Sequence, residues 1–164
     1  MRVETDPRAP AGARDLRVAL VVSRFNGPVT RRLREGAEAA LAQAGCRAAE
    51  TVEVPGAFEL PFAARAMALT RRFDAVVCLG CVIRGDTPHF EFISAAVAHG
   101  IAEASGDTGV PVAFGVLTTL TLEQALERSE PGPSNKGWEA AAAAVEMAQL
   151  VRRLAALADP GSRT

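Results

Sequence analysis

The sequence predicts an α/β protein, a three-layer α/β/α sandwich built on a four-stranded parallel sheet. Short apolar segments alternate with helical segments along the chain, and residues 75–83 are apolar without a break, as in a strand buried on both faces. Strands that alternate with helices form parallel sheets with right-handed crossovers, which place helices on both faces. The length of 164 residues suits a single domain, and 49% hydrophobic residues exclude a disordered chain.

The first half of the chain predicts two strands and two helices. In order, these are a strand over residues 16–22, a helix over 28–44, a strand over 50–54 and a helix over 58–72. Pro28 starts the first helix and Gly45 stops it, while Pro61 is tolerated in the first turn of the second helix. We therefore expect two β–α units in this half.

The second half continues the alternation. It predicts a strand over residues 75–83, a helix over 89–105, a strand over 110–117, a short helix over 121–129 and an alanine-rich helix over 135–157. Thr121 is the expected cap of the short helix. We expect the domain at residues 15–158, a flexible segment at 1–14 and a tail at 159–164. A sheet of four strands has exposed edges, which favours a homo-oligomer.

Charge and composition exclude several function classes. The formal net charge is -1, so no global field attracts nucleic acid or an anionic membrane. No run approaches the roughly 20 apolar residues of a membrane helix, and the N-terminus is too charged for a signal peptide. These observations predict a cytoplasmic protein without nucleic-acid or membrane partners.

The three cysteines, Cys46, Cys78 and Cys81, are an odd number and fit a reducing compartment. The C-L-G-C spacing resembles half of a zinc or thioredoxin motif, but it falls inside a predicted strand. Residues three apart in a strand point to opposite faces and lie about 10 Å apart. We therefore interpret the cysteines as buried structural thiols, with no metal site.

Ligands of open parallel sheets bind beyond the carboxyl ends of the strands. The segments expected there carry aromatic, polar or glycine residues, namely Phe25 and Asn26, then Ala57, Phe58 and Glu59, then Val82 to His89, then Phe114 to Thr119. Three of these four segments include a phenylalanine, although aromatic residues make up only 5% of the chain. This gathering predicts a flat ligand held by stacking.

The third segment carries the sharpest signal. Gly85 allows a ligand to approach the backbone closely, and Asp86 and Thr87 precede a helix whose N–H groups form a natural phosphate site. His89, in the first turn of that helix, could move protons in carbonyl or amine chemistry. The alternative is that Asp86 or Thr87 only caps the helix and that His89 is a surface residue. His99, in mid-helix, is predicted to be structural.

Five motifs follow one another along residues 16–150, namely S-R-F-N, V-P-G-A-F-E-L-P, V-I-R-G-D-T-P-H-F-E, P-V-A-F-G-V-L-T-T and N-K-G. Together they resemble the 6,7-dimethyl-8-ribityllumazine synthase family. The resemblance implies a flavodoxin-like sheet and a transferase of riboflavin biosynthesis. Its reaction would condense 5-amino-6-(ribitylamino)uracil with 3,4-dihydroxy-2-butanone 4-phosphate to give 6,7-dimethyl-8-ribityllumazine. No redox or metal cofactor is implied.

The resemblance also implies roles for individual residues. Phe25 would stack on the pyrimidine beside Asn26, and His89 would be the acid/base. The other implied substrate contacts are Ala57 and Glu59 for the ring and ribityl chain, Val82 and Ile83 for the ring through their backbone, Asp86, Thr87 and Arg128 for the phosphate, and Lys136 for the ribityl chain. Phe58 and Gly85 are also predicted to bind substrate. Phe114 would come from a neighbouring subunit of a homopentamer, so that the site is shared.

Two rival classes share the architecture, the archaeal-type riboflavin synthase and a non-catalytic flavin-binding or shell-forming protein. The complete motif set disfavours the former, and the presence of His89 with the phosphate turn disfavours the latter.

One stretch departs from the family, because S-E-P-G-P-S-N stands where icosahedral members resemble A-G-T-K-A-G-N. The sequence thus leaves open whether pentamers assemble further. Lys136, the only lysine beside 17 arginines, is better explained by a ligand than by the start of a helix.

Overall fold

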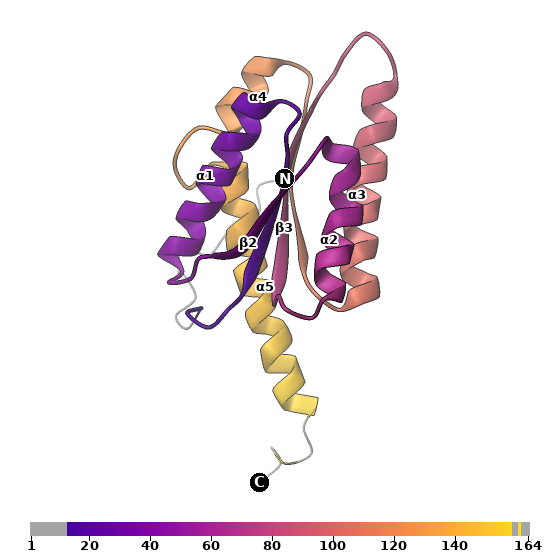
Figure 1. Ribbon diagram of the computed structural model, residues 1–164. Helices are drawn as coiled ribbons and strands as arrows, with labels where there is room; N and C mark the ends of the chain where they lie inside the picture. The colour runs from indigo at the N-terminus through magenta and orange to yellow at the C-terminus, as the bar shows by residue number, and fades with distance from the viewer. Residues whose placement is uncertain (1–12, 159–160, 162–164) are drawn as a thin grey trace.

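The computed structural model describes residues 13–158 and residue 161. Its four strands, β1 (Val18–Ser23), β2 (Ala48–Val54), β3 (Ala75–Ile83) and β4 (Val112–Thr119), form one parallel sheet in the order β2-β1-β3-β4 (Figure 1). This confirms the predicted four-stranded parallel sheet. Most of the predicted N-terminal segment and C-terminal tail lies outside the described residues, and Ala13 is already fully buried.

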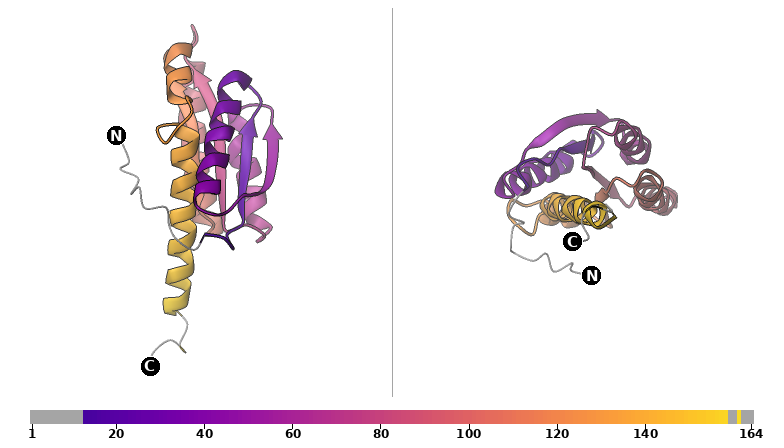
Figure 2. Two further views of the ribbon diagram at one scale, coloured as in Figure 1. Left: turned by 90° about the vertical axis from the view of Figure 1, so that its left-hand side faces the viewer. Right: turned by 90° about the horizontal axis from the view of Figure 1, so that it is seen from below.

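The helices cover both faces of the sheet. They are α1 (Gly27–Gln43), α2 (Leu60–Leu69), α3 (His89–Thr108), α4 (Leu122–Arg128) and α5 (Lys136–Ala158), with a 3-10 turn, η1 (Ala57–Glu59), before α2. Seen from below, α1 and α5 lie on one side of the sheet and α2 and α3 on the other (Figure 2). No helix among the described residues is both long enough and apolar enough to cross a membrane.

Two hydrophobic cores hold the three layers together. One core joins α1 and α5 to the sheet, and the other joins α2 and α3 to its opposite face. Strand β3 contributes to both, with Cys81 in the first core and Cys78 in the second. All three cysteines are free and buried, which confirms the expected structural thiols on opposite faces of the strand.

Local chemistry explains where the predicted boundaries hold and where they shift. Gly45 ends α1 at a φ of 85°, and the Thr121 side chain caps α4 by accepting from the backbone N–H of Gln124, both as predicted. The predicted helix over 58–72 was too long. The first residues of that segment form the 3-10 turn η1, and the α-helix proper begins at Leu60 with Pro61 in its first turn. The helix ends before Arg71, whose φ of 59° is left-handed.

The start of α5 is fixed by Asn135, a buried side chain whose role the sequence did not reveal. Its Oδ1 accepts from the backbone N–H of Gly137 at 2.8 Å, and its Nδ2 donates to the carbonyl oxygens of Ser129 and Arg32 at 2.8 and 3.1 Å. One side chain thus caps α5, closes the loop after α4 and ties both to α1. Gly137 completes this docking, because a Cβ there would overlap the backbone of Leu33.

We predict that Gly137→Ala destabilises the fold, since the added methyl meets rigid backbone of α1 and the two helices must separate. Overpacking of this kind costs about 1–3 kcal/mol or more. Urea unfolding followed by circular dichroism measures it. The matched control is Gly106→Ala in α3, where a Cβ has no heavy atom within 4 Å, and which should be neutral or stabilising. Equal stability of Gly137→Ala and wild type would contradict the close approach.

Candidate active site

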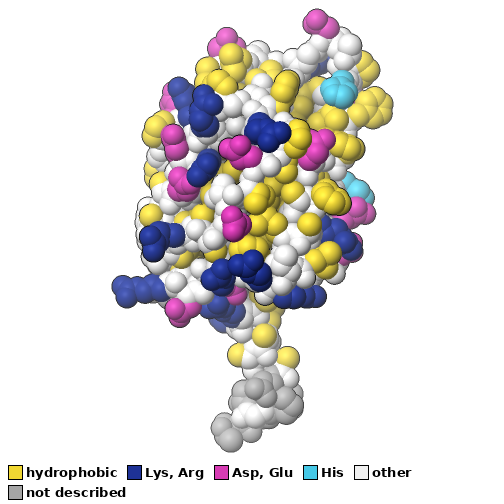
Figure 3. Space-filling model, in the orientation of Figure 1, with side chains coloured by type: hydrophobic (Ala, Val, Ile, Leu, Met, Phe, Trp, Pro, Cys, Tyr) yellow, Lys and Arg dark blue, Asp and Glu magenta, His cyan; other side chains and the backbone are white. Residues whose placement is uncertain are grey.

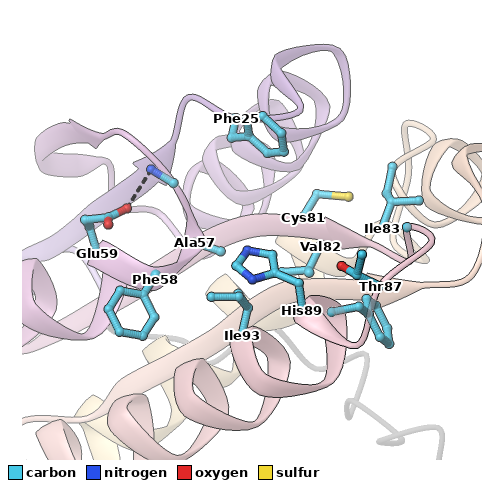
Figure 4. Close-up of a pocket in the computed structure, with 13 residues that line it drawn as sticks. Phe25, Ala57, Phe58, Glu59, Cys81, Val82, Ile83, Thr87, His89 and Ile93 are labelled. Carbon is cyan, nitrogen blue, oxygen red and sulfur yellow. Dashed lines mark hydrogen bonds between the residues drawn. The ribbon is translucent and has the colours of Figure 1, made fainter.

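A cavity of about 320 Å³ opens at the carboxyl ends of β1 and β3 (Figure 4). This is the position where the chain leaves two neighbouring strands in opposite senses, the usual ligand site of such sheets. The predicted residues that line it are Phe25, Ala57, Phe58, Glu59, Val82, Ile83, Gly85, Thr87 and His89. The structure therefore brings the segments after β1, β2 and β3 together, as the sequence predicted.

The loop after β1 is held so that Phe25 faces the cavity. The backbone N–H groups of Arg24 and Phe25 donate to the carbonyl oxygens of Val54 and Pro55 at 2.9 and 3.2 Å. Asn26 adopts a left-handed φ of 58°, and its Nδ2 donates to the carbonyl oxygen of Cys81 at 2.9 Å. With a ring 69% exposed, Phe25 is not a core residue. Asn26 lies beside the cavity and is not part of its lining.

Glu59 has a structural contact and also faces the cavity. Its Oε2 accepts from the backbone N–H of Gly56 at 2.9 Å, the bond drawn in Figure 4. This bond supports the first turn of η1, where an acidic side chain is also favoured by the helix dipole. Its Oε1 accepts no hydrogen bond within the described part of the chain, so one carboxylate oxygen is available to a hydroxyl group.

The start of α3 supplies the other wall. The ring of His89 lies between Phe58 and Thr87 in Figure 4. Neither Asp86 nor Thr87 caps α3, because Pro88 occupies the N-cap position and no side-chain cap hydrogen bond is formed there by the described residues. The capping alternative for these two residues is therefore wrong. Asp86 is exposed and does not line the cavity.

His99, predicted to be structural, lies outside this cavity. It is 77% exposed on α3, where its Nε2 is 3.2 Å from Oε1 of Glu103. That placement is a solvent-exposed i,i+4 contact, which gives the residue no access to the cavity.

A second cavity, of about 570 Å³, is lined by β4, by the end of α4 and by the start of α5. It holds the three remaining predicted residues, Phe114, Arg128 and Lys136. Arg128 ends α4, and its Nη1 donates to the carbonyl oxygen of Gln124 at 3.1 Å. A cation at the end of a helix is favoured by the helix dipole, and this one contact uses a single one of the five guanidinium N–H donors.

The two cavities share no lining residue. The prediction that Phe114 joins the other phenylalanines at the carboxyl edge of the sheet is wrong. Strand β4 begins at Val112 and continues to Thr119, so Phe114 is near its start and pairs with Cys78 rather than with the end of β3. The predicted site residues thus form two separate groups in one chain.

Sequence reasoning also missed members of each group. Phe90 and Ile93 line the first cavity, and Glu139 lines the second. Helical spacing could have found two of them, because Ile93 is four residues after His89 and Glu139 is three residues after Lys136. Phe90 carried no such signal.

Comparison with known proteins identifies the family. Residues 15–152 match the family model described as 6,7-dimethyl-8-ribityllumazine synthase. The chain belongs to this family. The protein of that name from Syntrophus aciditrophicus (strain SB) is 53% identical over 144 residues, 87% of this chain and 94% of its own length. The one from Chlorobium phaeovibrioides (strain DSM 265 / 1930) is 51% identical over 146 residues, with the same coverage of 87% and 94%.

In this member of the lumazine synthase family, the cavity wall includes a thiol. Burial raises the pKa of Cys81 to about 11 and that of Cys78, in the second core, to about 12. A raised thiol pKa favours the neutral, unreactive form. The thiol of Cys81 therefore contributes apolar surface to the cavity rather than a nucleophile.

We predict that Cys81 and Cys78 resist alkylation in the folded protein. At pH 8, a pKa of 11 leaves about one thiol in a thousand ionised, against about one in ten at the ordinary value. Iodoacetamide labelling followed by mass spectrometry should modify these residues at least tenfold more slowly in buffer than in urea. Labelling of Cys81 at the unfolded rate would contradict its burial.

Proposed function

We propose that the two cavities are halves of one active site, contributed by two copies of the chain. The reaction of the family is the condensation of 5-amino-6-(ribitylamino)uracil with 3,4-dihydroxy-2-butanone 4-phosphate to 6,7-dimethyl-8-ribityllumazine, the penultimate step of riboflavin biosynthesis. This transferase activity is the function that family membership over residues 15–152 supports for this chain.

The separation of the two cavities carries the proposal of a shared site. The family resemblance assigns one site to residues that a single chain distributes over two cavities with no common member. His89 and Arg128 lie in different cavities, although both are expected to act on the same phosphate ester. A neighbouring copy that brings its second cavity to the first resolves this conflict.

The surface supports such an association. Phe58, Phe62 and Phe92 are 59%, 80% and 72% exposed, an unusual exposure for large apolar side chains. Hydrophobic side chains gather at the upper right of Figure 3, over the start of α3. Strands β2 and β4 are open edges of the sheet. We therefore propose a homopentamer, in which each interface closes one site.

The first cavity suits the pyrimidine. Its aromatic wall, formed by Phe25 and Phe58, can stack on a flat ring, and the backbone of Val82 and Ile83 can bond the edge of that ring. The free Oε1 of Glu59 can accept from a ribityl hydroxyl. Asn26 acts here first as a positioning residue, because its bond to Cys81 fixes the turn that presents Phe25.

The phosphate of the second substrate is assigned to the start of α3 and to the guanidinium of a neighbouring copy. Gly85 and Thr87 line the cavity next to the uncapped N–H groups of α3, which favour an anion. Asp86 would contribute only its backbone N–H, since its carboxylate would repel the phosphate. Arg128, with free donors, can bind the phosphate bidentately.

The proposed mechanism is positioning followed by proton transfer. The 5-amino group attacks the ketone carbon, and loss of one water gives an imine between the two substrates. The phosphate then leaves as inorganic phosphate, and the ribitylamino nitrogen closes the ring with loss of a second water. Holding amine and ketone together supplies most of the acceleration. His89, beside the phosphate turn, moves the protons, and Lys136 forms no covalent intermediate.

We also propose a cytoplasmic location, which the three free, buried thiols support.

Light scattering would measure the number of chains in the assembly. A mass of five chains supports the pentamer, and multiples of five would show decamers or shells. A monomer at micromolar concentration would contradict the shared site.

The proposed reaction is tested by incubation of the protein with both substrates. We expect the absorbance and fluorescence of the lumazine to appear together with one phosphate per product. Product formation would also reject a purely flavin-binding role. The absence of product with an intact, assembled protein would overturn the proposed function.

We predict that His89→Ala lowers kcat by about 100-fold with little change in KM, because a positioned acid/base contributes about that much or more. Steady-state kinetics measures both constants. The control is His99→Ala, which removes an exposed histidine of the same helix outside both cavities and should leave kcat unchanged. An unchanged kcat in His89→Ala would remove the assigned role.

We predict that Arg128→Ala raises KM for the butanone phosphate by about 10-fold or more and leaves KM for the pyrimidine within about twofold, since a charge-assisted bond to phosphate contributes roughly 1.5–3 kcal/mol. Arg34→Ala on α1, which removes an exposed arginine that pairs with Glu38 on the same helix, is the control. Equal effects of Arg128→Ala on both substrates would contradict a phosphate contact.

A further inference from the structure

The second cavity contains an ion pair between Lys136 and Glu139, and no role described above involves Glu139. On the first turn of α5, the Nζ of Lys136 donates to Oε2 and Oε1 of Glu139 at 2.8 and 3.0 Å. Both side chains are mostly shielded from solvent, with exposed fractions of 35% and 25%, and both line the cavity beside Arg128. The two carboxylate oxygens therefore hold two of the three ammonium donors.

Helix formation alone does not account for this pair. A cation is unfavourable in the first turn of a helix, where Glu139 by itself would be favourable. An arginine at position 136 would retain several free donors in a fixed plane after pairing with Glu139, whereas a lysine retains one. The position holds the only lysine of a chain with 17 arginines. What the pair provides is a single directed donor without net charge.

Arg128, the other cation of the cavity, is not neutralised by a close carboxylate as Lys136 is. Its nearest acidic partner, Glu127, is 77% exposed and lies 3.8 Å away, a contact that solvent screens. Arg128 therefore keeps its positive charge toward the cavity. The cavity has two cationic side chains, of which one is neutralised at short range and the other is not.

We propose that Glu139 is a specificity-determining and positioning residue of this half-site. By neutralising Lys136, it leaves Arg128 as the cation with which the second cavity binds an anion, and it aims the remaining ammonium donor at a neutral hydroxyl group. The cavity can then hold the polyol of one substrate and the phosphate of the other without exchanging them. This inference rests on the proposed function, in which this cavity joins the first one in a single site, and on the ribityl contact that the family resemblance implies for Lys136.

The test is Glu139→Gln, which keeps the size and one acceptor oxygen but releases the charge of Lys136. Isothermal titration with inorganic phosphate is the first measurement, and we expect binding at least 10-fold tighter than in the wild type, or a second phosphate per site. In kinetics with the two substrates, KM for the pyrimidine should rise at least fivefold, and inorganic phosphate should inhibit at correspondingly lower concentration. Phosphate binding identical to the wild type would overturn the proposal.

Three further variants make the test specific. Glu139→Asp retains the charge and should keep the phosphate affinity of the wild type. Glu139→Gln combined with Lys136→Met should lose the gained affinity, because the released cation is gone. Glu146→Gln changes the net charge equally at an exposed position of α5 outside the cavity and should gain nothing. Equal gains in Glu146→Gln and Glu139→Gln would overturn the proposal.

The two measurements separate this inference from the proposed function. Phosphate titration requires no turnover, so it decides the role of Glu139 even for a protein that forms no lumazine. A wild-type protein without product would refute the proposed reaction alone. Unchanged phosphate binding in an active Glu139→Gln variant would refute the inference alone.

Discussion

The parallel pairing of β1 with β3 is the interaction on which the candidate site depends. It places Ser23 and Ile83 at the same edge of the sheet, so the chain leaves both strands beside one opening. The crossovers then carry α1 to one face and α3 to the other, and a cavity remains between them. The bond from Asn26 to the carbonyl oxygen of Cys81 locks this edge by joining the loop after β1 to β3 itself.

Much of this arrangement could be predicted from the sequence, because it follows from local signals. The unbroken apolar run of β3, the proline that starts α1 and the glycine that ends it determine the alternation of strands and helices. The alternation in turn brings Phe25, Glu59 and His89 to one cavity. The prediction that failed, the place of Phe114, depended on the register between β3 and β4. The position of Phe114 required the end of β4 to be known, and nothing local indicates that Thr119 still belongs to the strand.

The division of the site could not be predicted from spacing, because it depends on which face of the sheet each helix covers. Asn135 and Gly137 decide this for the second cavity by holding α5 against α1, and they occupy the N-K-G motif on both sides of Lys136. The motif thus fixes the position of Lys136 at the start of α5. The fold places Arg128 and His89 in different cavities, and the proposed shared site rests on this separation.

A mixing experiment tests the divided site most directly. His89→Ala and Arg128→Ala proteins would be dissociated in mild denaturant, mixed in equal amounts and allowed to reassemble. The assay uses the butanone phosphate well below the wild-type KM, where both unmixed variants are impaired. If each site takes one cavity from each of two copies, random rings regain about one quarter of the wild-type activity, since that fraction of interfaces pairs two intact cavities. If His89 and Arg128 acted within the same chain, every site would lack one of them. Activity no greater than that of the unmixed variants, in rings shown to have exchanged subunits, would contradict the account.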